Sequence, residues 1–451
     1  MKRPILALFA VVTVLGTTAR SQAPSSFTMA LAGDSIITRR ISMYTEPAHV
    51  RLFDMIRHAD ASFTNLEMLF HDYEPYPMHE SGGTWMRAEP GLVKDLVWAG
   101  FDLVSRANNH TGDYGVEGMR LTTKYVAEAN LVQAGVGEDL AEAREARFLD
   151  TPKGRVALVS VASTFPDHSR AGRARDGVRG RPGLNPLRFS TTNVVSRERL
   201  RQLRAIQQEL TGRPPAEGDA LTFMRQRFVA GDRPGVRTEP RKDDVEEIAA
   251  VVRNASRMAD YTLVTIHAHE GAPGDRTMPA EFLVTFAHAM IDAGADLFAG
   301  HGPHVVRGIE MYKGKPIVYS LGDFIFQNET LLRMPAESYE AEGMGAGAGV
   351  ADFNDKRFNN DRSGFPADEE IWQGIVAVPE WDNRRLADLA IYPIALGFGK
   401  GRTERGRPVL ADAVTGKKIL DDVAKRSAPF GTRITIRDGV GHVELGPASH
   451  D

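Results

Sequence analysis

DLFAGHGPHVVRGIEMYKGKPIVYSLGDFIF, residues Asp296 to Phe326, is the stretch around which the rest of the chain is organised. Its pattern predicts a strand over the apolar residues 297–299, a loop, a second strand, a turn at Lys313 to Pro316 and a third strand. Two histidines, His301 and His304, follow the first strand. Neutral imidazoles at the mouth of a sheet are good ligands for a transition metal, and neighbouring glycines let the backbone approach an ion. Surface histidines on a loop are the alternative, and this stretch alone leaves the two interpretations equal.

The composition is that of a globular protein, and it excludes several kinds of site. Hydrophobic residues make up 42% and charged residues 25% of 451 residues, enough for one large α/β domain with insertions or for two or three ordinary domains. Lysine and arginine number 55 against 59 acidic residues, a net charge of −4 that gives no support for nucleic-acid binding by the whole chain. The absence of cysteine excludes disulfides, zinc–thiolate sites and cysteine nucleophiles.

Residues 1–23 have the pattern of a secretory signal peptide. Lys2 and Arg3 form a positive n-region, and the apolar run from Ile5 to Leu15 is too short for a comfortable membrane span. Small residues before Pro24 supply candidate cleavage sites, and an uncleaved anchor is the alternative. We therefore expect an exported protein in the periplasm or at the cell surface.

Metal-ligand side chains follow each of several predicted strands. Asp34 comes after a strand over residues 26–31, and a second strand ends in Asn65 and Glu67. Each could have a structural explanation, such as a helix cap or a polar turn. Together they are hard to explain by core packing, because buried carboxylates and imidazoles need partners. We therefore predict one buried cluster that shares metal ions, formed by Asp34, Glu67, Asn109, His267, His301 and His304, with His110, His269 and Asp323 near them.

Two long segments are predicted to be irregular. Residues 167–240 look like an insertion, with five arginines from Arg170 to Arg181 and a charged helical stretch at 196–210. A basic patch there could meet an anionic polymer, but a solvated, mobile loop is the favoured interpretation. Residues 337–367, rich in Gly, Asn, Asp and Glu, are expected to form a flexible loop. Beyond it the patterns predict a hairpin at 376–378 and 389–394, a helix at 417–426, and a strand pair at 433–436 and 442–445.

Five motifs resemble those of a known family: Gly33-Asp34, Asn65-Leu66-Glu67, NNHTGDYG at 108–115, IDAGADLFAGHGPH at 291–304 and YSLGDF at 319–324. From about Phe27 to Ile325 the chain resembles the CapA (PgsA-type) poly-γ-glutamate capsule proteins of the calcineurin-like metallophosphoesterase superfamily. The resemblance implies an α/β (α+β) fold, a four-layer β-sandwich flanked by helices, with the Arg-rich insertion and a C-terminal β-rich extension. That domain would span 26–330, followed by a flexible loop at 331–370 and a part at 371–451 that completes the same domain.

The resemblance also implies a site for two divalent metal ions, of Mn, Fe, Zn or Mg. His110 would stay off the metals as a proton donor or charge stabiliser, and His269 is a second catalytic candidate. Substrate contacts would come from Asn65, Asn108 and Asp323. Among the ligands, Asp34 would hold one metal, Glu67 would bridge both, Asn109 and His267 would hold the second, and His301 and His304 would go one to each.

The chain departs from the family pattern at three places. Ser35 and Ile36 follow Asp34 where the superfamily has Asp-x-His, so one histidine ligand is missing. His267-Ala268-His269-Glu270 replaces the usual His-Trp-Gly-x-Glu-Tyr, and Asp323 stands where Asn is usual. Two outcomes remain open: a weaker first metal site, or compensation by His269.

Two functions of different classes fit the resemblance. The first is a metal-dependent hydrolase or transferase of the cell envelope that acts in poly-γ-glutamate or capsule-like polymer metabolism. The second is a non-catalytic accessory subunit that binds the polymer for a membrane capsule synthase. The Asn109–His110 pair favours catalysis, the missing Asp-x-His favours binding, and the fold alone cannot separate them. The expected partners are an anionic polymer such as poly-γ-glutamate and a synthase complex, with no nucleic acid.

Overall fold

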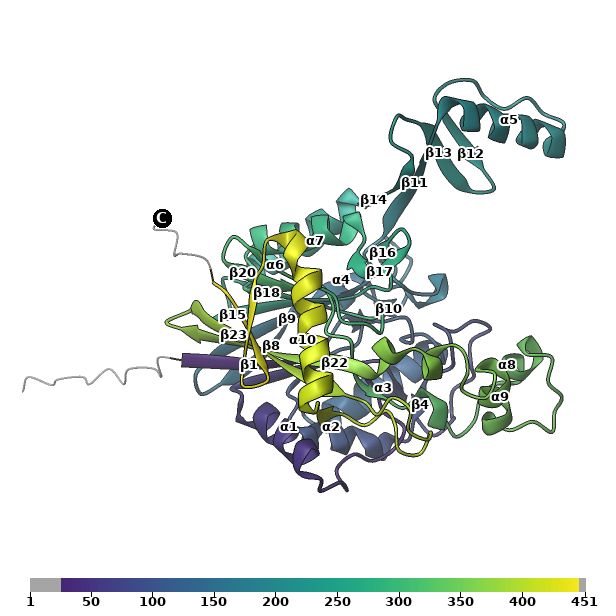
Figure 1. The fold of residues 1–451 in the computed structure, drawn as a ribbon. Helices are drawn as coiled ribbons and strands as arrows, with labels where there is room; N and C mark the ends of the chain where they lie inside the picture. The colour runs from purple at the N-terminus through teal and green to yellow at the C-terminus, as the bar shows by residue number, and fades with distance from the viewer. Residues whose placement is uncertain (1–25, 446–451) are drawn as a thin grey trace, which may run out of the picture.

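Two β-sheets pack face to face at the centre of the computed structural model, which describes residues 26–445 (Figure 1). Apolar side chains from both sheets meet between them. The ring of Phe27 in the larger sheet stacks on the ring of Tyr261 in the smaller, with the ring centroids 4.1 Å apart. Burial of this shared apolar surface is the main force that holds the sheets together. The predicted mixed α/β class is confirmed.

In the described part of the chain the larger sheet has ten strands and the smaller has six. The larger has the order β25-β26-β23-β22-β1-β2-β5-β6, with β21 beside β1 and β24 beside β23. Its strands are β1 (Ser26–Ile36), β2 (Ala61–Leu66), β5 (Leu103–Ser105), β6 (Val132–Ala134), β21 (Asp323–Phe326), β22 (Gln373–Asp382), β23 (Arg385–Ala395), β24 (Val409–Leu410), β25 (Ile434–Arg437) and β26 (Val440–Val443). The smaller sheet has the order β19-β20-β18-β15-β9-β8 and contains β8 (Arg147–Thr151), β9 (Gly154–Ala162), β15 (Tyr261–His267), β18 (Leu297–His301), β19 (Ile309–Tyr312) and β20 (Lys315–Val318).

Helices cover the outer faces of both sheets. On α7 (Glu281–Asp292) the side chains of Phe282, Phe286 and Met290 recur every four residues, and this helical period buries all three against the smaller sheet. The helix α10 (Ala413–Ser427) contributes instead to the core between the sheets. The other helices of the body are α1 (Pro47–His58), α2 (Val93–Ala99) and α3 (Gly115–Glu128) beside the larger sheet, and α4 (Leu140–Arg144) and α6 (Lys242–Ala255).

Strand register brings the predicted ligands to one edge of the molecule. In the larger sheet Asp34 pairs with Asn65 of β2 on one side and with Asp323 of β21 on the other. In the smaller sheet His267 pairs with His301. The strand β1 is longer than predicted, so Asp34 lies inside it, where the register with β2 shifts. Gly33 permits this course, because a Cβ there would lie 1.8 Å from the carbonyl oxygen of Gly322.

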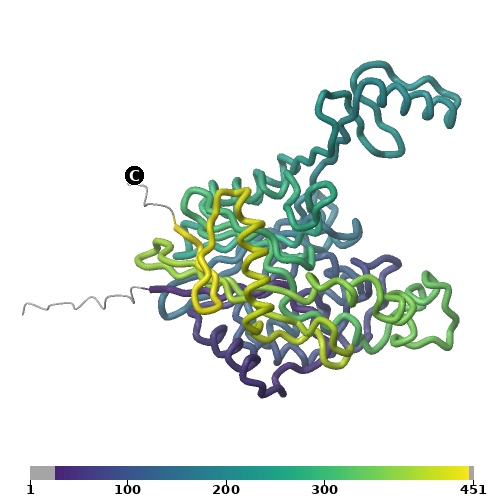
Figure 2. The backbone as a smooth tube through the Cα atoms, in the orientation of Figure 1, coloured from purple at the N-terminus to yellow at the C-terminus, as the bar shows by residue number. Residues whose placement is uncertain are grey.

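The interpretation of residues 167–240 as a mobile loop is wrong, because the segment is folded in two parts. Residues 167–188 pack on the body, where Leu184 and Leu187 are fully buried. Residues 189–240, which we call the arm, project away from the body (Figures 1 and 2). The arm contains β11 (Phe189–Val195), α5 (Arg197–Thr211), β12 (Ala220–Phe223), β13 (Gln226–Ala230) and β14 (Gly235–Pro240).

The second predicted loop, within residues 331–370, is also wrong, since it contains α8 (Ala336–Ala341) and α9 (Val350–Arg357). Aromatic residues scattered among the polar ones supply its core: Phe353 and Phe358 are buried. Beyond it the predicted hairpin, helix and final strand pair are confirmed as β22–β23, α10 and β25–β26. Between residues 26 and 445 no helix is long and apolar enough to cross a bilayer, and the predicted signal peptide lies outside that range.

A hairpin variant tests whether the arm folds independently of the body. Strands β11 and β14 pair antiparallel, with Asn193 opposite Val236, so a two-residue Asn-Gly turn can replace residues 194–235. We expect this variant to unfold cooperatively at nearly the wild-type temperature. Replacement of residues 167–240 should instead give insoluble protein, because it also removes Leu184 and Leu187 from the core. Circular dichroism melts would contradict this division if the two variants behaved alike.

Candidate metal centre

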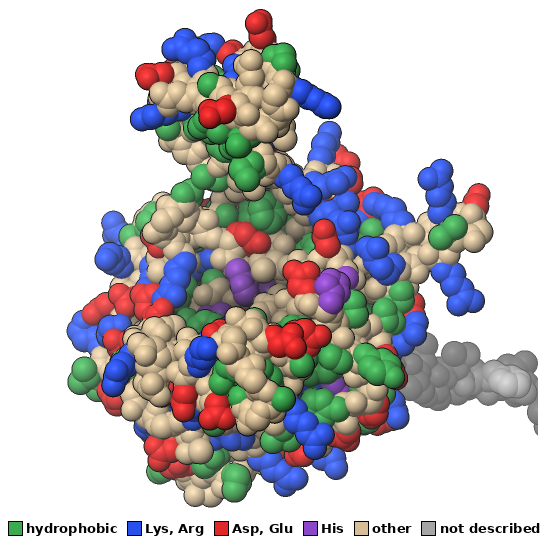
Figure 3. All heavy atoms as spheres, turned by 90° about the vertical axis from the view of Figure 1, so that its right-hand side faces the viewer, with side chains coloured by type: hydrophobic (Ala, Val, Ile, Leu, Met, Phe, Trp, Pro, Cys, Tyr) green, Lys and Arg blue, Asp and Glu red, His purple; other side chains and the backbone are tan. Residues whose placement is uncertain are grey.

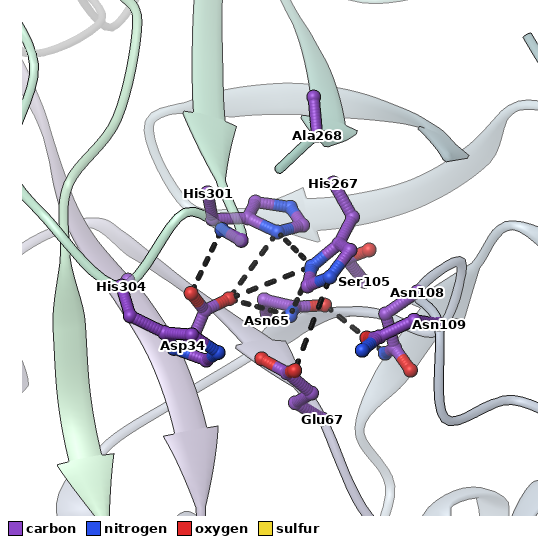
Figure 4. Close-up of polar contacts among 12 residues, drawn as sticks. Asp34, Asn65, Glu67, Ser105, Asn108, Asn109, His267, Ala268, His301 and His304 are labelled. Carbon is purple, nitrogen blue, oxygen red and sulfur yellow. Dashed lines mark hydrogen bonds and ion pairs between the residues drawn. The ribbon is translucent and has the colours of Figure 1, made fainter. Parts of the chain in front are cut away.

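Asp34 lies at the centre of a buried polar cluster between the ends of the two sheets (Figure 4). Its Oδ1 accepts a hydrogen bond from Asn65 Nδ2 at 2.7 Å, and its Oδ2 accepts one from the backbone N–H of Gly302 at 2.8 Å. Oδ1 also lies 3.4 Å from His301 Nδ1 and 3.7 Å from His267 Nδ1. Although burial opposes ionisation, these histidines lower the pKa of Asp34, which favours the carboxylate form that binds metals.

His267 contacts two other imidazoles, one through each ring nitrogen. Its Nδ1 lies 3.2 Å from His301 Nδ1, and its Nε2 lies 3.0 Å from His269 Nε2. Burial, together with the neighbouring histidines, lowers the pKa of His267 far below its ordinary value and that of His269 to about 3. Both rings are therefore neutral at physiological pH, the form in which an imidazole ligates a metal.

Glu67 is fully buried, and neither carboxylate oxygen has a hydrogen-bond partner among residues 26–445. Its Oε1 lies 3.9 Å from His267 Nε2 and 3.7 Å from His110 Nε2. Burial first, and then the negative charge of Asp34 and Asp323, raises the pKa of Glu67 far above its ordinary value. A buried polar group without a partner costs about 1 to 3 kcal/mol, so a bound cation would relieve a real penalty here.

The residues present fit a metal centre, and one possible set of ligands includes His269. Three further buried atoms at the site have no partner among the described residues: Asn109 Oδ1, His301 Nε2 and Asp323 Oδ2. Three sets can each bring one ligand atom per residue within 4.8 Å of the others: Asp34–His267–His301, Glu67–His267–His269 and Asp34–Glu67–His304. The place of His269 in the second set favours its role as a compensating ligand.

His304 reaches the site through a strained backbone. Its φ of 56° lies in the left-handed region, which a non-glycine residue occupies at a cost of about 1 to 3 kcal/mol, most often at functional sites. Its Nδ1 lies 2.8 Å from Asp323 Oδ1. Burial alone would lower the pKa of His304, but Asp323 raises it, while burial raises the pKa of Asp323 to about 6. Asp323, predicted to contact substrate, is thus paired with a histidine of the cluster.

The loop after β5 supplies the remaining site residues. His110 Nδ1 donates to Asp113 Oδ2 at 2.7 Å, and this leaves Nε2 facing Glu67. Asp113 was missed by sequence reasoning, although it stands three residues after His110 in the NNHTGDYG motif. Asn109 lies beside the cluster, and its Nδ2 donates to the carbonyl of Gly82 at 2.9 Å.

The two other predicted substrate-binding residues form a chain that orients Asp34. Asn108 Nδ2 donates to the carbonyl of Leu66 at 2.8 Å and contacts Asn65 Oδ1 at 3.3 Å. Asn65 in turn donates to Asp34. Figure 3 shows histidine side chains in a recess of the surface on the face below the arm.

Several known proteins resemble this chain. An uncharacterized protein y4sH of Sinorhizobium fredii is 36% identical over 457 residues, which cover 96% of each chain. Capsule biosynthesis protein CapA of Bacillus anthracis is 24% identical over 66% of this chain and 59% of its own length. PGA biosynthesis protein CapA of Bacillus subtilis is 28% identical over 52% of this chain and 45% of its own. A hypothetical protein from Thermus thermophilus covers 81% of this chain and 98% of its own at 14% identity, with a TM-score of 0.36, too low to show a shared fold.

A family model described as "Bacterial capsule synthesis protein PGA_cap" matches residues 28–328. The match contains the motifs at Asp34, Glu67, Asn109 and His301, and it confirms the resemblance to the CapA-type proteins. Because this model covers most of the chain, and a relative of 36% identity spans nearly all of it, the chain belongs to the bacterial capsule synthesis protein family PGA_cap.

Proposed function

We propose that this protein is a metal-dependent hydrolase or transferase that acts on poly-γ-glutamate or a related capsule polymer. The observation that carries the proposal is the buried carboxylate of Glu67, which faces His267 and His110 and has no hydrogen-bond partner in the described part of the chain. Family membership and the names of the CapA relatives support the polymer class. The face-to-face sheets flanked by helices are consistent with a metallophosphoesterase-like sandwich, which we include in the proposal.

The residues of the cluster have distinct tasks in this proposal. Bound divalent cations would lower the pKa of a water and offset negative charge on a substrate oxygen. Glu67 belongs to two of the ligand sets, so it is placed to bridge two ions. His110 is positioned to give a proton to the leaving group, because Asp113 holds its Nδ1–H and leaves Nε2 towards the cluster.

An assay of metal-loaded protein tests the proposal. Protein loaded with Mn²⁺ or Zn²⁺ is incubated with poly-γ-glutamate and with simple phosphoesters, and chain length and released phosphate are measured. We expect metal-dependent shortening or transfer of the γ-glutamyl chain, and no turnover by His301→Ala. Absence of turnover on both substrates by a fully loaded protein would overturn the enzymatic proposal.

The arm favours a second candidate function, that of a polymer-binding accessory subunit. Residues 189–240 contain nine arginines and six acidic residues, although the whole chain carries a net charge of −4. Several of these arginines are exposed and have no ion-pair partner among the described residues: Arg201, Arg213, Arg225, Arg227 and Arg233. Such a patch would attract a polyanion. A relative from Mycobacterium tuberculosis is named a probable polyglutamine synthesis accessory protein, and this name also supports an accessory role. It is 30% identical over 53% of this chain and 49% of its own.

Charge removal on the arm should weaken polymer binding. We expect the triple variant Arg201→Ala, Arg225→Ala and Arg227→Ala to bind poly-γ-glutamate at least tenfold more weakly, a loss of about 1.4 kcal/mol. The matched control removes three exposed arginines from the C-terminal strands, namely Arg385, Arg433 and Arg437. Titrations at low and high salt should show that only the wild type and the control lose affinity steeply as salt rises. Equal affinity of the two triple variants would contradict a role for the arm.

We also propose export, on the basis of the signal-peptide pattern of residues 1–23. N-terminal sequencing of the protein from its host should give a start near Pro24. Intact Met1 on protein in the cytoplasmic fraction would count against it.

A further inference from the structure

A second group of possible metal ligands lies outside the buried cluster and shares no residue with it. His79, Glu80 and His168 can each bring one ligand atom within 4.8 Å of the others. The rings of the two histidines have centroids 5.6 Å apart. His79 and Glu80 are exposed, His168 is half-buried, and Glu80 has no ion-pair partner in the part of the chain that the structure describes.

The hydrogen bonding of His168 prepares it to ligate a cation. Its Nε2 lies 3.2 Å from the carbonyl oxygen of Gly112. Because a carbonyl only accepts hydrogen bonds, Nε2 carries the proton and Nδ1 keeps its lone pair. Nδ1 is buried and has no hydrogen-bond partner among the residues that the structure describes. A histidine whose other nitrogen is fixed by a backbone carbonyl is the usual arrangement of a metal ligand.

These residues join three segments beside the buried cluster. Residues 78–82, which carry His79 and Glu80, are bonded to the loop after β5: Gly82 N donates to Asp113 Oδ1 at 3.0 Å, and Asn109 Nδ2 donates to Gly82 O. The third segment, residues 167–169, carries His168 and approaches that loop so closely that a Cβ on Gly112 would lie 2.1 Å from Ser169 Oγ. An ion bound here would therefore hold the loop that presents Asn109 and His110.

We propose that His79, Glu80 and His168 form a rim site for one divalent transition metal ion, separate from the buried cluster. Two imidazoles and one carboxylate form a donor set typical of Zn²⁺, with water in the fourth position. The ion at the rim site braces residues 78–82 and 167–169 over the loop after β5. The bound ion restrains the loop after β5 more tightly than its hydrogen bonds do alone.

Zinc content of matched histidine variants tests the rim site. Wild-type protein, His79→Ala, His168→Ala and the control His58→Ala are dialysed at micromolar free Zn²⁺ and analysed by mass spectrometry. His58 is exposed and bonds only to its own helix at Asp54 O, so its loss should change nothing. We expect both rim variants to bind one ion per chain fewer than the wild type and the control. Equal zinc content in all four proteins would overturn the proposal.

Hydrogen exchange gives a readout that does not depend on activity. Zn²⁺ should slow amide exchange in residues 78–82 and 109–113 further in the wild type than in His79→Ala, where only the buried cluster can respond. Since His79 is exposed, this variant is expected to fold normally even if His168→Ala disturbs the contact with Gly112. Identical protection in the wild type and His79→Ala would show that no ion at the rim site holds the loop.

Discussion

Glu67→Gln is expected to weaken metal binding by the buried cluster strongly while raising the thermal stability of the metal-free protein. Glu67 belongs to two of the three buried ligand sets, and Gln cannot supply a bridging negative charge. In the metal-free protein the same substitution removes a buried carboxyl that lies close to Asp34 and Asp323. Melting temperature measured with and without added Mn²⁺ should show a metal-dependent rise in the wild type and a much smaller rise in the variant.

The raised pKa of Glu67 also predicts how the stability of the metal-free protein changes with pH. The pKa of Glu67 is raised in the folded state, so above pH ~4.5, where the unfolded chain releases its proton, the folded protein still holds it. Stability of the metal-free wild type should therefore fall as pH rises from about 4.5 towards the folded pKa, and Glu67→Gln should lack this contribution. The matched control is Glu117→Gln, an exposed carboxylate on α3. A metal response of Glu67→Gln equal to that of Glu117→Gln would contradict the assignment.

His110→Ala is expected to lower turnover by about 10²- to 10⁴-fold while metal content stays that of the wild type. His110 belongs to none of the ligand sets found among the described residues. Its Nε2 faces the cluster and lies 3.7 Å from Glu67 Oε1. The measurement is kcat on whichever substrate the wild type turns over, poly-γ-glutamate or a phosphoester, alongside metal analysis of the same samples. Loss of metal from His110→Ala would make it a ligand rather than a proton donor.

Asp113→Asn separates positioning from proton transfer. Asp113 accepts hydrogen bonds from His110 Nδ1 and from the backbone N–H groups of Gly82 and Met86, so it fixes the ring and its tautomer. We expect a smaller loss of kcat than for His110→Ala, with a shifted pH–rate profile. An unchanged profile would show that Asp113 supports only the loop.

If the accessory-subunit function holds instead, the wild type has no turnover and His110→Ala leaves polymer affinity unchanged.

The buried cluster was predictable because its residues share one local signal. Asp34, Glu67, His267 and His301 each follow a short apolar run of the kind that forms a buried strand. Parallel strands bring such residues to a common edge, and the register of Asp34 with Asn65, and of His267 with His301, does this here. The meeting of these residues at one edge could therefore be expected without knowledge of the strand register.

Other features depend on contacts that no local pattern reveals. The arm has few apolar residues, with only Leu200 buried in α5 and Leu221 in β12, so its sheet left little periodic signal, whereas α5 matches the helical stretch predicted at 196–210. The segment of α8 and α9 is stabilised by aromatic residues that are separated by glycines and charges. The pairing of His304 with Asp323 arises from the placement of β21 beside β1, which is a tertiary contact. The rim site likewise joins residues almost ninety positions apart, and nothing in the sequence links them.

The most direct test of the account is an anomalous difference map from crystals of the protein soaked in Mn²⁺ or Zn²⁺. We expect strong peaks among Glu67, His267 and His301, within ligand distance of their side chains, and the loss of these peaks in His301→Ala crystals with an unchanged fold. A map from crystals soaked at a saturating metal concentration that shows no peak between these residues would contradict the central claim that the buried cluster is a metal centre.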